Sequence, residues 1–415
     1  MMIFNNNKLD KFLDDSNNLE ESATLRNAFS DIDLCLADIT DLFRNIVKQK
    51  DPYNTLKIYV DRAIRHDFEA EVLDKEFRSE ETLQAWCERV FKSKNYCLES
   101  NHGDHYSEIL SRKIARAVSP LFERTKLPLG GVAISIFAGD YGFTPFGVHY
   151  DHDLSSVFHF HLGPNNKKIH LWDRETFLKE TGSIKPYFDA KKILSSGHSD
   201  IIEKNDFYNL PGNYHHVGET LGYSVGIAVA LVRFNQQAFF SNVLSYLNNS
   251  ILRGKGTDIL DHRTHNLTTC GEEQFYVQFL EHLTCDLTAP FGEVLKQAYR
   301  DYRHSILSNA GLVTASKPRN IDSSTFEKCQ FIPITPFKIS YYNEHGKLIY
   351  FVRRNKFVCS YHPDITKFFD KLNDGNTFLL NQVYSELKSL RKDQIINLLK
   401  GIVSYNGMDC DVKAQ

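Results

Sequence analysis

The stretch from Thr144 to Trp172 reads TPFGVHYDHDLSSVFHFHLGPNNKKIHLW, and residues 206–231 read DFYNLPGNYHHVGETLGYSVGIAVAL. In both stretches, short runs of β-branched and aromatic residues alternate with Gly, Pro, Asn and Asp, which is typical of strands joined by tight turns. The same texture begins near residue 130 with the run VAISIF. Residues 126–236 are therefore predicted to form a closed or double-sheet antiparallel structure.

The segments on either side of this β-region have a different texture. Residues 1–125 are predicted to be mostly helical, because apolar residues recur every three or four positions in stretches such as 107–122. A helical pattern returns over residues 237–325. The last segment, 326–415, opens with a hairpin pattern and continues with three amphipathic helices, near 364–372, 377–388 and 392–403. The chain is thus expected to be of the α+β class, with a C-terminal domain the size of a winged helix.

Length and composition exclude several classes of protein. The chain has 415 residues, enough for two or three domains, and 49 basic against 52 acidic residues give a net charge of −3. This balance excludes a protein that coats nucleic acid, and a nucleic-acid partner is not expected. No apolar run approaches the roughly 18 residues of a membrane helix. The eight cysteines are scattered without a CxxC pair, which indicates a reducing compartment rather than a disulfide framework. We therefore expect a soluble, cytoplasmic protein without a membrane partner.

Histidine is the informative residue in the β-region. Eight of the 17 histidines fall between positions 149 and 216, at His149, His152, His159, His161, His170, His198, His215 and His216. A metal pocket needs such clustering, because imidazole nitrogens and carboxylate oxygens must converge from different strands. Two histidines and one carboxylate on one face of a metal ion form the triad of non-haem iron oxygenases, whose other coordination positions stay open.

The pattern His-x-Asp, which supplies two of the three ligands, occurs four times. Three of the pairs lack a suitable context: one lies between helical segments, one is too close to the later histidines to leave room for strands, and one has no later histidine and precedes a helix. They are His102–Asp104, His198–Asp200 and His362–Asp364, respectively. Only His149-Tyr-Asp151 begins a series of strands that returns to a histidine, at His215 and His216. We therefore take His149 and Asp151 as candidate metal ligands.

The two quoted stretches together resemble the JmjC-type cupin oxygenases, and the layout is most similar to the ribosomal-oxygenase branch. The resemblance covers residues 130–235 well, the downstream segments only in outline, and the first 120 residues not at all. It implies a double-stranded β-helix (jelly roll), a helical dimerisation segment and a winged-helix-like C-terminal domain. It also implies Fe(II), 2-oxoglutarate and O2, a protein or peptide substrate that is hydroxylated on a side chain, and a homodimer.

The resemblance assigns site residues by position. His149 and Asp151 fall on the proximal ligand pair, and the distal ligand is His215 or His216. The family's turn commonly has Pro-Gly, two residues and then the ligand, which favours His215. His216 would point to the other side of a strand and would then be an outer imidazole. His159 falls where the family often has Gln, which implies a polar role inside the barrel.

The family also uses a cation to bind the distal carboxylate of 2-oxoglutarate, because a buried carboxylate without a partner is costly. Lys167 and Lys168 are the candidates, one strand after the His-x-Asp pair. They point to opposite faces of that strand, and Lys168 shares its face with His170 and Trp172. The resemblance slightly favours Lys168, although the turn before it is longer than is usual in the family.

Two alternatives stay open. The first is the same chemistry on a free amino acid or another small molecule, which would need a closed pocket and no C-terminal domain. The second is a cupin with a different metal chemistry, or a binding protein without turnover. A missing cosubstrate cation would mark the second alternative, so it gains if neither Lys167 nor Lys168 faces the metal.

Overall fold

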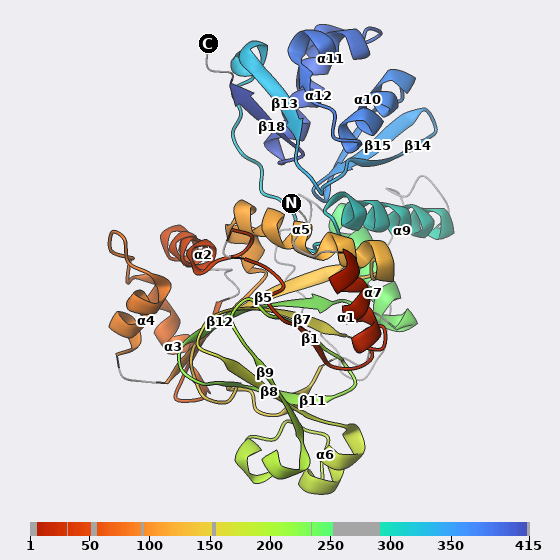
Figure 1. Ribbon diagram of the computed structural model, residues 1–415. Helices are drawn as coiled ribbons and strands as arrows, with labels where there is room; N and C mark the ends of the chain where they lie inside the picture. The colour runs from red at the N-terminus through yellow and green to blue at the C-terminus, as the bar shows by residue number, and fades with distance from the viewer. Residues whose placement is uncertain are drawn as a thin grey trace, which may run out of the picture.

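The computed structural model describes residues 6–30, 32–50, 56–92, 95–151, 155–233, 235–251 and 291–412. Two antiparallel sheets form its centre (Figure 1). The larger sheet has eight strands in the order β1 (Ala23–Leu25), β10 (Phe207–Leu210), β7 (Val157–Pro164), β12 (Ser224–Leu231), β5 (Val132–Asp140), β4 (Tyr96–Asn101), β2 (Leu56–Val60) and β3 (Ala63–Ile64). The smaller sheet has the order β6 (His149–Tyr150), β11 (His215–Thr220), β8 (Lys167–Trp172) and β9 (His198–Ile202). The predicted antiparallel β-structure in the middle of the chain is confirmed.

Alternation along the strands gives the larger sheet two different faces. In β7, Phe158 and Phe160 are fully buried in the core under the N-terminal helices. Val157 and His159, which alternate with them, face the smaller sheet and line a cavity. Each buried phenyl ring contributes roughly 2–3 kcal/mol through removal of apolar surface from water. The N-terminal helices therefore cover one face of the larger sheet, and the other face, which points to the smaller sheet, carries polar groups.

The N-terminal region is mostly helical, as the sequence predicted, but it also contributes four short strands that the sequence did not predict. It contains α1 (Asn6–Asp15), α2 (Leu36–Gln49), α3 (His66–Leu73), α4 (Leu83–Phe91) and α5 (Glu108–Thr125), but β1 to β4 join the larger sheet. β2 and β4 extend this sheet beyond β5, with Ile58 opposite Leu98 and Leu98 opposite Ala138. The helical pattern hid these strands because they are only five and six residues long. They bring N-terminal side chains into the cavity between the sheets.

The segment after the sheets is helical, as expected, where it is described. α7 (Gln236–Ile251) packs against α9 (Phe291–Ser308), with Val243, Leu247 and Ala298 buried between them. Residues 252–290 of the predicted helical segment lie outside the described residues, so a dimer through this segment stays a prediction. One further helix, α6 (Arg174–Thr181), follows β8, and short 3₁₀ turns span Gly103–Tyr106, Ala190–Lys192, Leu194–Ser196 and Ser323–Lys328. Within the described part of the chain, no helix combines the length and apolar character that a membrane crossing requires.

The C-terminal domain has its own apolar core. Its three helices, α10 (Pro363–Asn373), α11 (Leu380–Glu386) and α12 (Lys392–Ser404), lie where the amphipathic pattern predicted them. The predicted hairpin is the first part of a meander of β14 (Ser340–Glu344), β15 (Lys347–Val352) and β16 (Asn355–Ser360). A second small sheet contains β17 (Phe378–Leu379), β13 (Cys329–Pro333) and β18 (Met408–Val412).

A disulfide joins Cys329 of β13 to Cys410 of β18. The scattered cysteines indicated a reducing compartment, and their spacing did not predict this bond. The two residues are 81 positions apart and come together only because β13 and β18 pair in the folded sheet. Four other cysteines among the described residues are free thiols, at Cys35, Cys87, Cys97 and Cys359.

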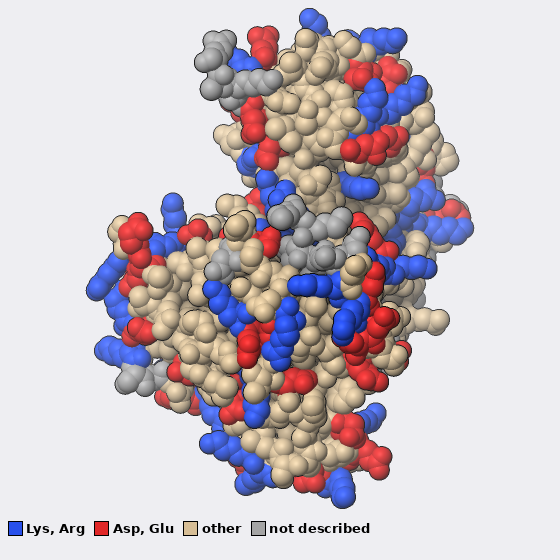
Figure 2. Space-filling model, in the orientation of Figure 1, with Lys and Arg blue, Asp and Glu red and all other residues tan. Residues whose placement is uncertain are grey.

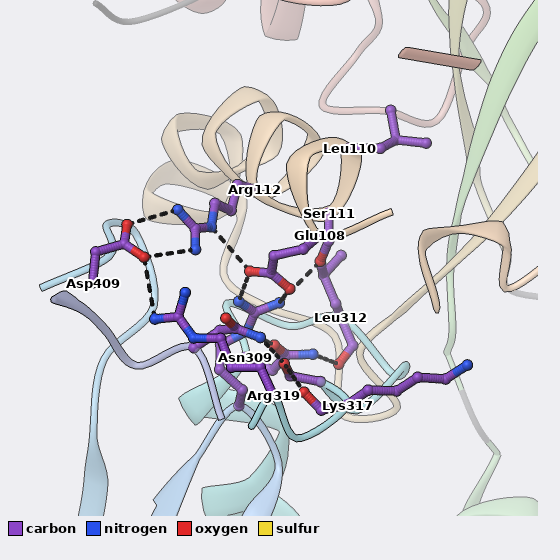
Figure 3. Close-up of polar contacts among 12 residues, drawn as sticks. Glu108, Leu110, Ser111, Arg112, Asn309, Leu312, Lys317, Arg319 and Asp409 are labelled. Carbon is purple, nitrogen blue, oxygen red and sulfur yellow. Dashed lines mark hydrogen bonds and ion pairs between the residues drawn. The ribbon is translucent and has the colours of Figure 1, made fainter. Parts of the chain in front are cut away.

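A buried polar network ties the C-terminal domain to α5 (Figure 3). Arg353, in the turn between β15 and β16, is only 1% exposed and donates to Glu108 at 2.6 Å, to Ser111 at 3.1 Å and to Asn309 at 2.5 Å. Next to this network, Arg112 of α5 forms an ion pair with Asp409 of β18 at 2.9 Å. The turn between β15 and β16 is therefore packed between the N-terminal half and α9, and it does not project into solvent.

Charged side chains do not gather by sign on the face of the molecule shown in Figure 2. Lys and Arg are interspersed with Asp and Glu over both the sheet-containing half and the C-terminal domain. Binding of a nucleic-acid backbone uses clustered cations that neutralise several phosphates. This face lacks such a cluster, in line with the near-zero net charge of the chain.

Candidate metal centre

A cavity of about 460 Å³ lies between the two sheets. Its walls come from six strands of the larger sheet and from β6, β8 and β11 of the smaller one. The side chains that line it fall into a histidine–carboxylate group, the lysine of β8, an apolar floor and a polar wall that contains a second lysine. They include His149, Asp151, His159, Lys167, His216, Phe137, Val157, Ile169, Leu210, Lys57, Tyr59, Glu99 and Ser135.

His149, Asp151 and His216 form the histidine–carboxylate group. Each offers one ligand atom, and these three atoms all lie within 4.8 Å of one another. Antiparallel pairing of β6 with β11 sets His216 opposite His149, and Asp151 follows β6 directly. The Asp151 carboxylate lies 3.6 Å from His149 Nε2 and 3.7 Å from His216 Nε2. Two imidazoles and one carboxylate in this arrangement are the donor set of the open-sided iron triad.

Backbone contacts orient both imidazoles of this group. His149 Nδ1 lies 3.0 Å from the carbonyl oxygen of Gly147, and His216 Nδ1 lies 3.3 Å from that of Tyr214. Each ring is thereby left with Nε2 directed to the centre of the group, as is usual for metal-binding histidines. Burial lowers the pKa of His216 to about 4, so this imidazole is neutral and able to bind a metal at neutral pH.

His215, which the turn pattern favoured as distal ligand, lies on the opposite face of β11. Its ring stacks on Phe177 with centroids 3.9 Å apart and lies 5.1 Å from the ring of Tyr150. It is 2% exposed, and neither ring nitrogen has a hydrogen-bond partner. The preference for His215 is therefore corrected: the register of β6 and β11 puts His216, the alternative, beside His149 and Asp151.

The slight preference for Lys168 over Lys167 as the cosubstrate cation is also corrected. Lys167, and not Lys168, lines the cavity, because Lys167 shares its strand face with Ile169. Lys167 is 7% exposed and has no carboxylate partner among the described residues. Its ammonium lies 5.5 Å from the centre of the Phe137 ring, and burial lowers its pKa to about 8. A buried cation without a counter-charge marks a place where an anion would be stabilised.

Gly218 makes room for the Lys167 side chain. A Cβ at this position would lie 2.7 Å from Lys167 Cε and 3.2 Å from Thr144 Oγ1. Thr144 in turn bonds the backbone of Gly218, accepting from its N–H and donating to its carbonyl oxygen at 2.9 Å each. Any larger residue at position 218 would displace the Lys167 side chain, so the glycine is what allows the ammonium to lie in the cavity.

His159 faces the cavity from β7, as the resemblance implied. It pairs with Ala228 and Tyr208 on the neighbouring strands, and burial lowers its pKa well below the ordinary value. It is therefore a neutral imidazole that faces the same space as His216 and Lys167.

The other described histidines of the cluster have partners outside the cavity. His161 bonds the carbonyl oxygen of Asn165 at 2.8 Å, and His170 lies between Ser199 at 2.7 Å and Glu219 at 2.8 Å. His198 is largely exposed and bonds Asp200 at 2.9 Å. His152 lies outside the described residues. The clustering of histidines thus predicted the right region but overstated the number that meet at one point.

The remaining His-x-Asp pairs also have local roles. Asp104 is buried beside Thr314, which donates to it at 2.9 Å, at the contact between the N-terminal half and the C-terminal linker. His362 is the N-cap of α10 and accepts from the backbone N–H of Asp364, so this pair has a capping role at the start of the helix. Neither pair is near the cavity lining.

A polar wall of the cavity was missed in the sequence. It consists of Lys57 and Tyr59 from β2, Glu99 from β4 and Ser135 from β5, and Asn101 of β4 bonds both Glu99 and Ser135. The only sequence signal is alternation in LKIYV and YCLESN, where these polar residues occupy one strand face. That signal could not be used without knowing that β2 and β4 join the larger sheet.

The comparisons with known proteins agree with this fold. A structure of the ribosomal oxygenase YcfD from Escherichia coli, in complex with cobalt and 2-oxoglutarate, superposes with a TM-score of 0.51 and 13% identity, over 96% of this chain and 98% of that chain. A crystal structure of Escherichia coli YcfD gives a TM-score of 0.50 and 12% identity over the same shares. No family model and no curated protein matches the sequence. The resemblance to the ribosomal-oxygenase branch is thus confirmed at the level of the fold, over nearly the whole chain.

Proposed function

We propose that this chain is an Fe(II)- and 2-oxoglutarate-dependent oxygenase that hydroxylates a side chain in a protein or peptide, on a jelly-roll core. The observation that carries the proposal is that His149, Asp151 and His216 share one cavity with the unpaired, buried Lys167. A metal cupin of different chemistry, or a binding protein, would give no reason for a buried cation in that place. The neighbour that holds cobalt and 2-oxoglutarate has the same fold.

Each residue has a separate task in this proposal. The imidazoles of His149 and His216 and the carboxylate of Asp151 hold the iron. Lys167 binds the distal carboxylate of 2-oxoglutarate, and His159 offers a neutral imidazole as a further hydrogen-bond partner. When bound, the iron with 2-oxoglutarate and O2 supplies the oxidising power for C–H hydroxylation. The apolar floor, including Val157 and Ile169, limits the water around these groups.

A protein or peptide substrate is supported by the surface beside the metal centre. Tyr187 pairs with Val148, the residue before His149, and the same segment exposes Phe188 by 59% and Ile184 by 57%. Exposed apolar side chains next to a reaction centre fit a chain that lies across the surface. We extend the proposal to a cytoplasmic homodimer with a winged-helix-like C-terminal domain. The second candidate, a free amino acid, would leave these apolar side chains without a role.

Anaerobic titration of the metal-free protein with Fe(II), and then with 2-oxoglutarate, tests the proposal. A weak visible charge-transfer band is expected when the keto acid chelates the open-sided iron. The band should be absent in the His149→Ala variant. Iron binding without a band would move the assignment to a cupin of different chemistry, and absence of iron binding would refute the metal centre.

Lys167→Met should weaken 2-oxoglutarate binding by about 30-fold or more, or about 2 kcal/mol, because the distal carboxylate would lose its buried cation. Iron affinity should be unchanged, and thermal stability should not fall, since Lys167 is a buried charge without a partner. Calorimetric titration of the iron-loaded protein measures the loss. The matched control is Lys168→Met on the opposite strand face, and equal losses in the two variants would contradict the assignment of Lys167.

Binding of 2-oxoglutarate should depend on pH through Lys167. Because burial lowers the pKa of Lys167 to about 8, the free protein carries the cation below that pH and loses it above. The dissociation constant should therefore rise by about tenfold per unit above pH 8. Titrations of Mn(II)-loaded protein across this range measure the effect. Lys167→Arg keeps its charge throughout and should give a flat profile, whereas a slope that survives in this variant would exclude Lys167 as its source.

A further inference from the structure

The polar wall of the cavity is organised around one carboxylate. Glu99 is 6% exposed and accepts hydrogen bonds from Lys57 at 2.9 Å, Asn101 at 2.9 Å and Tyr59 at 3.2 Å. Ser135 donates to the side-chain oxygen of Asn101 at 2.6 Å. We call these five residues the Glu99 network. Such a number of donors on one buried carboxylate fixes its position.

The strand register sets this network in the same cavity as the metal centre. Lys57 lies opposite Glu99, and Glu99 lies opposite Phe137, so all three point to the cavity side of the sheet. Phe146 spans the distance between the two sites, with its ring 4.6 Å from that of His149 and 6.3 Å from that of Tyr59. The Glu99 network and the metal centre therefore lie in one cavity, with Phe146 between them.

Each carboxylate that lines the cavity already has a partner or a task in the proposed function. Glu99 is paired with Lys57, Asp151 is a ligand of the metal in the proposed function, and Lys167 is the one cation of the described lining without a carboxylate partner. In the proposed function Lys167 binds the cosubstrate. A cationic side chain that entered would find no free carboxylate, and it would have to displace Lys57 from Glu99. Burial of a charge without a counter-charge is strongly unfavourable.

A neutral polar side chain that entered the cavity would instead find groups with which it can form hydrogen bonds. The Lys57 ammonium has three N–H bonds, of which one goes to Glu99, and its side chain is 42% exposed. Burial and the neighbouring Glu99 raise the pKa of Tyr59, which therefore stays a neutral phenol. Ser135 adds a hydroxyl that can accept. The wall thus offers hydrogen bonds without offering a net charge.

We propose that the Glu99–Lys57 pair is a charge filter for the substrate: the cavity accepts a neutral, hydrogen-bonding side chain of the carboxamide type and rejects a cationic one. This inference rests on the proposed function, because it assigns the substrate class of the same site. Lys57 and Glu99 are specificity-determining residues in it and do not touch the metal ligands.

The test compares two small probes, butyramide and n-butylammonium, on the Mn(II)-loaded protein with 2-oxoglutarate. Paramagnetic relaxation of the probe's methyl protons reports whether a probe sits beside the metal. In the wild type we expect at least a tenfold preference for butyramide. In Lys57→Met, which frees the Glu99 carboxylate, the preference should reverse. Lys57→Met/Glu99→Gln removes both charges and should restore the preference for butyramide, and it also avoids an unpaired buried carboxylate that could unfold the single variant.

Each outcome has a fixed meaning. Equal binding of the two probes, an unchanged preference in Lys57→Met, or no binding of either probe at millimolar concentration would overturn the charge filter. Failure of Mn(II) or 2-oxoglutarate to bind would instead refute the proposed function. In that case saturation-transfer measurements on the metal-free protein still compare the two probes at the Glu99 network, so the two failures can be told apart.

Discussion

Replacement of His216 by Phe is expected to lower the affinity for Fe(II) by more than about 100-fold, because even loss of a residue that only supports a ligand typically costs 10- to 100-fold. Phenylalanine keeps the planar ring but has no nitrogen to bind a metal. His216 supplies one of three candidate ligand atoms that lie within 4.8 Å of one another, and His159 is not part of this group. Titration with Fe(II) or Co(II) measures the loss directly.

His215→Phe is the matched control, since it makes the same substitution at the adjacent position. The His215 ring stacks on Phe177 and has no hydrogen-bond partner for either nitrogen, so a phenyl ring should fit the site and remove two unsatisfied polar atoms. Such a replacement is expected to be neutral or slightly stabilising. Metal affinity should stay at the wild-type level. The reverse pattern, with loss of metal in His215→Phe alone, would restore His215 as the distal ligand.

The preferences for His215 over His216 and for Lys168 over Lys167 were wrong for the same reason. The side chains of a strand alternate between its faces, so a shift of one residue exchanges the inner and outer sets. β8 and β11 pair with Thr220 opposite Lys167 and His216 opposite Leu171. This register puts Lys167 and His216 on one face, and Lys168 and His215 on the other. The two residues favoured from the sequence, Lys168 and His215, do lie on one face of the smaller sheet, but that face points away from the cavity.

Other parts of the site depended on pairings between distant segments. The motif His149-Tyr-Asp151 could be read from the sequence, because both candidate ligands lie within three residues. The Glu99 network could not, because β2 and β4 contribute to it only after they join β5 at the edge of the larger sheet. Their runs are short and lie between helices, so local periodicity could not assign them. The C-terminal helices were predicted well, since each is a continuous amphipathic segment.

The buried Arg353 forms an ion pair with Glu108 of α5 and a hydrogen bond with Asn309, the residue after α9, and breaking these contacts should cost much stability. Both Arg353 and Arg354 have positive φ, a conformation that residues other than glycine adopt rarely. The guanidinium of Arg353 lies 3.4 Å from the centre of the Phe337 ring and bonds Glu108 with two nitrogens. These contacts compensate for the backbone conformation, and removal of the arginine would leave Glu108 and Asn309 short of a partner.

Arg353→Met is therefore expected to destabilise the protein by about 3–5 kcal/mol, the usual cost of breaking one side of a buried ion pair. The transition that includes the C-terminal domain should move to lower urea concentration, and limited proteolysis should release that domain earlier. Fe(II) affinity should not change, because the cavity lies in the other half of the molecule. Arg391→Met is the matched control: Arg391 pairs with Asp393 on the surface and is 75% exposed, so its loss should change stability by less than about 0.5 kcal/mol. If the two variants were equally stable, the network in Figure 3 would not be what holds the C-terminal domain against α5.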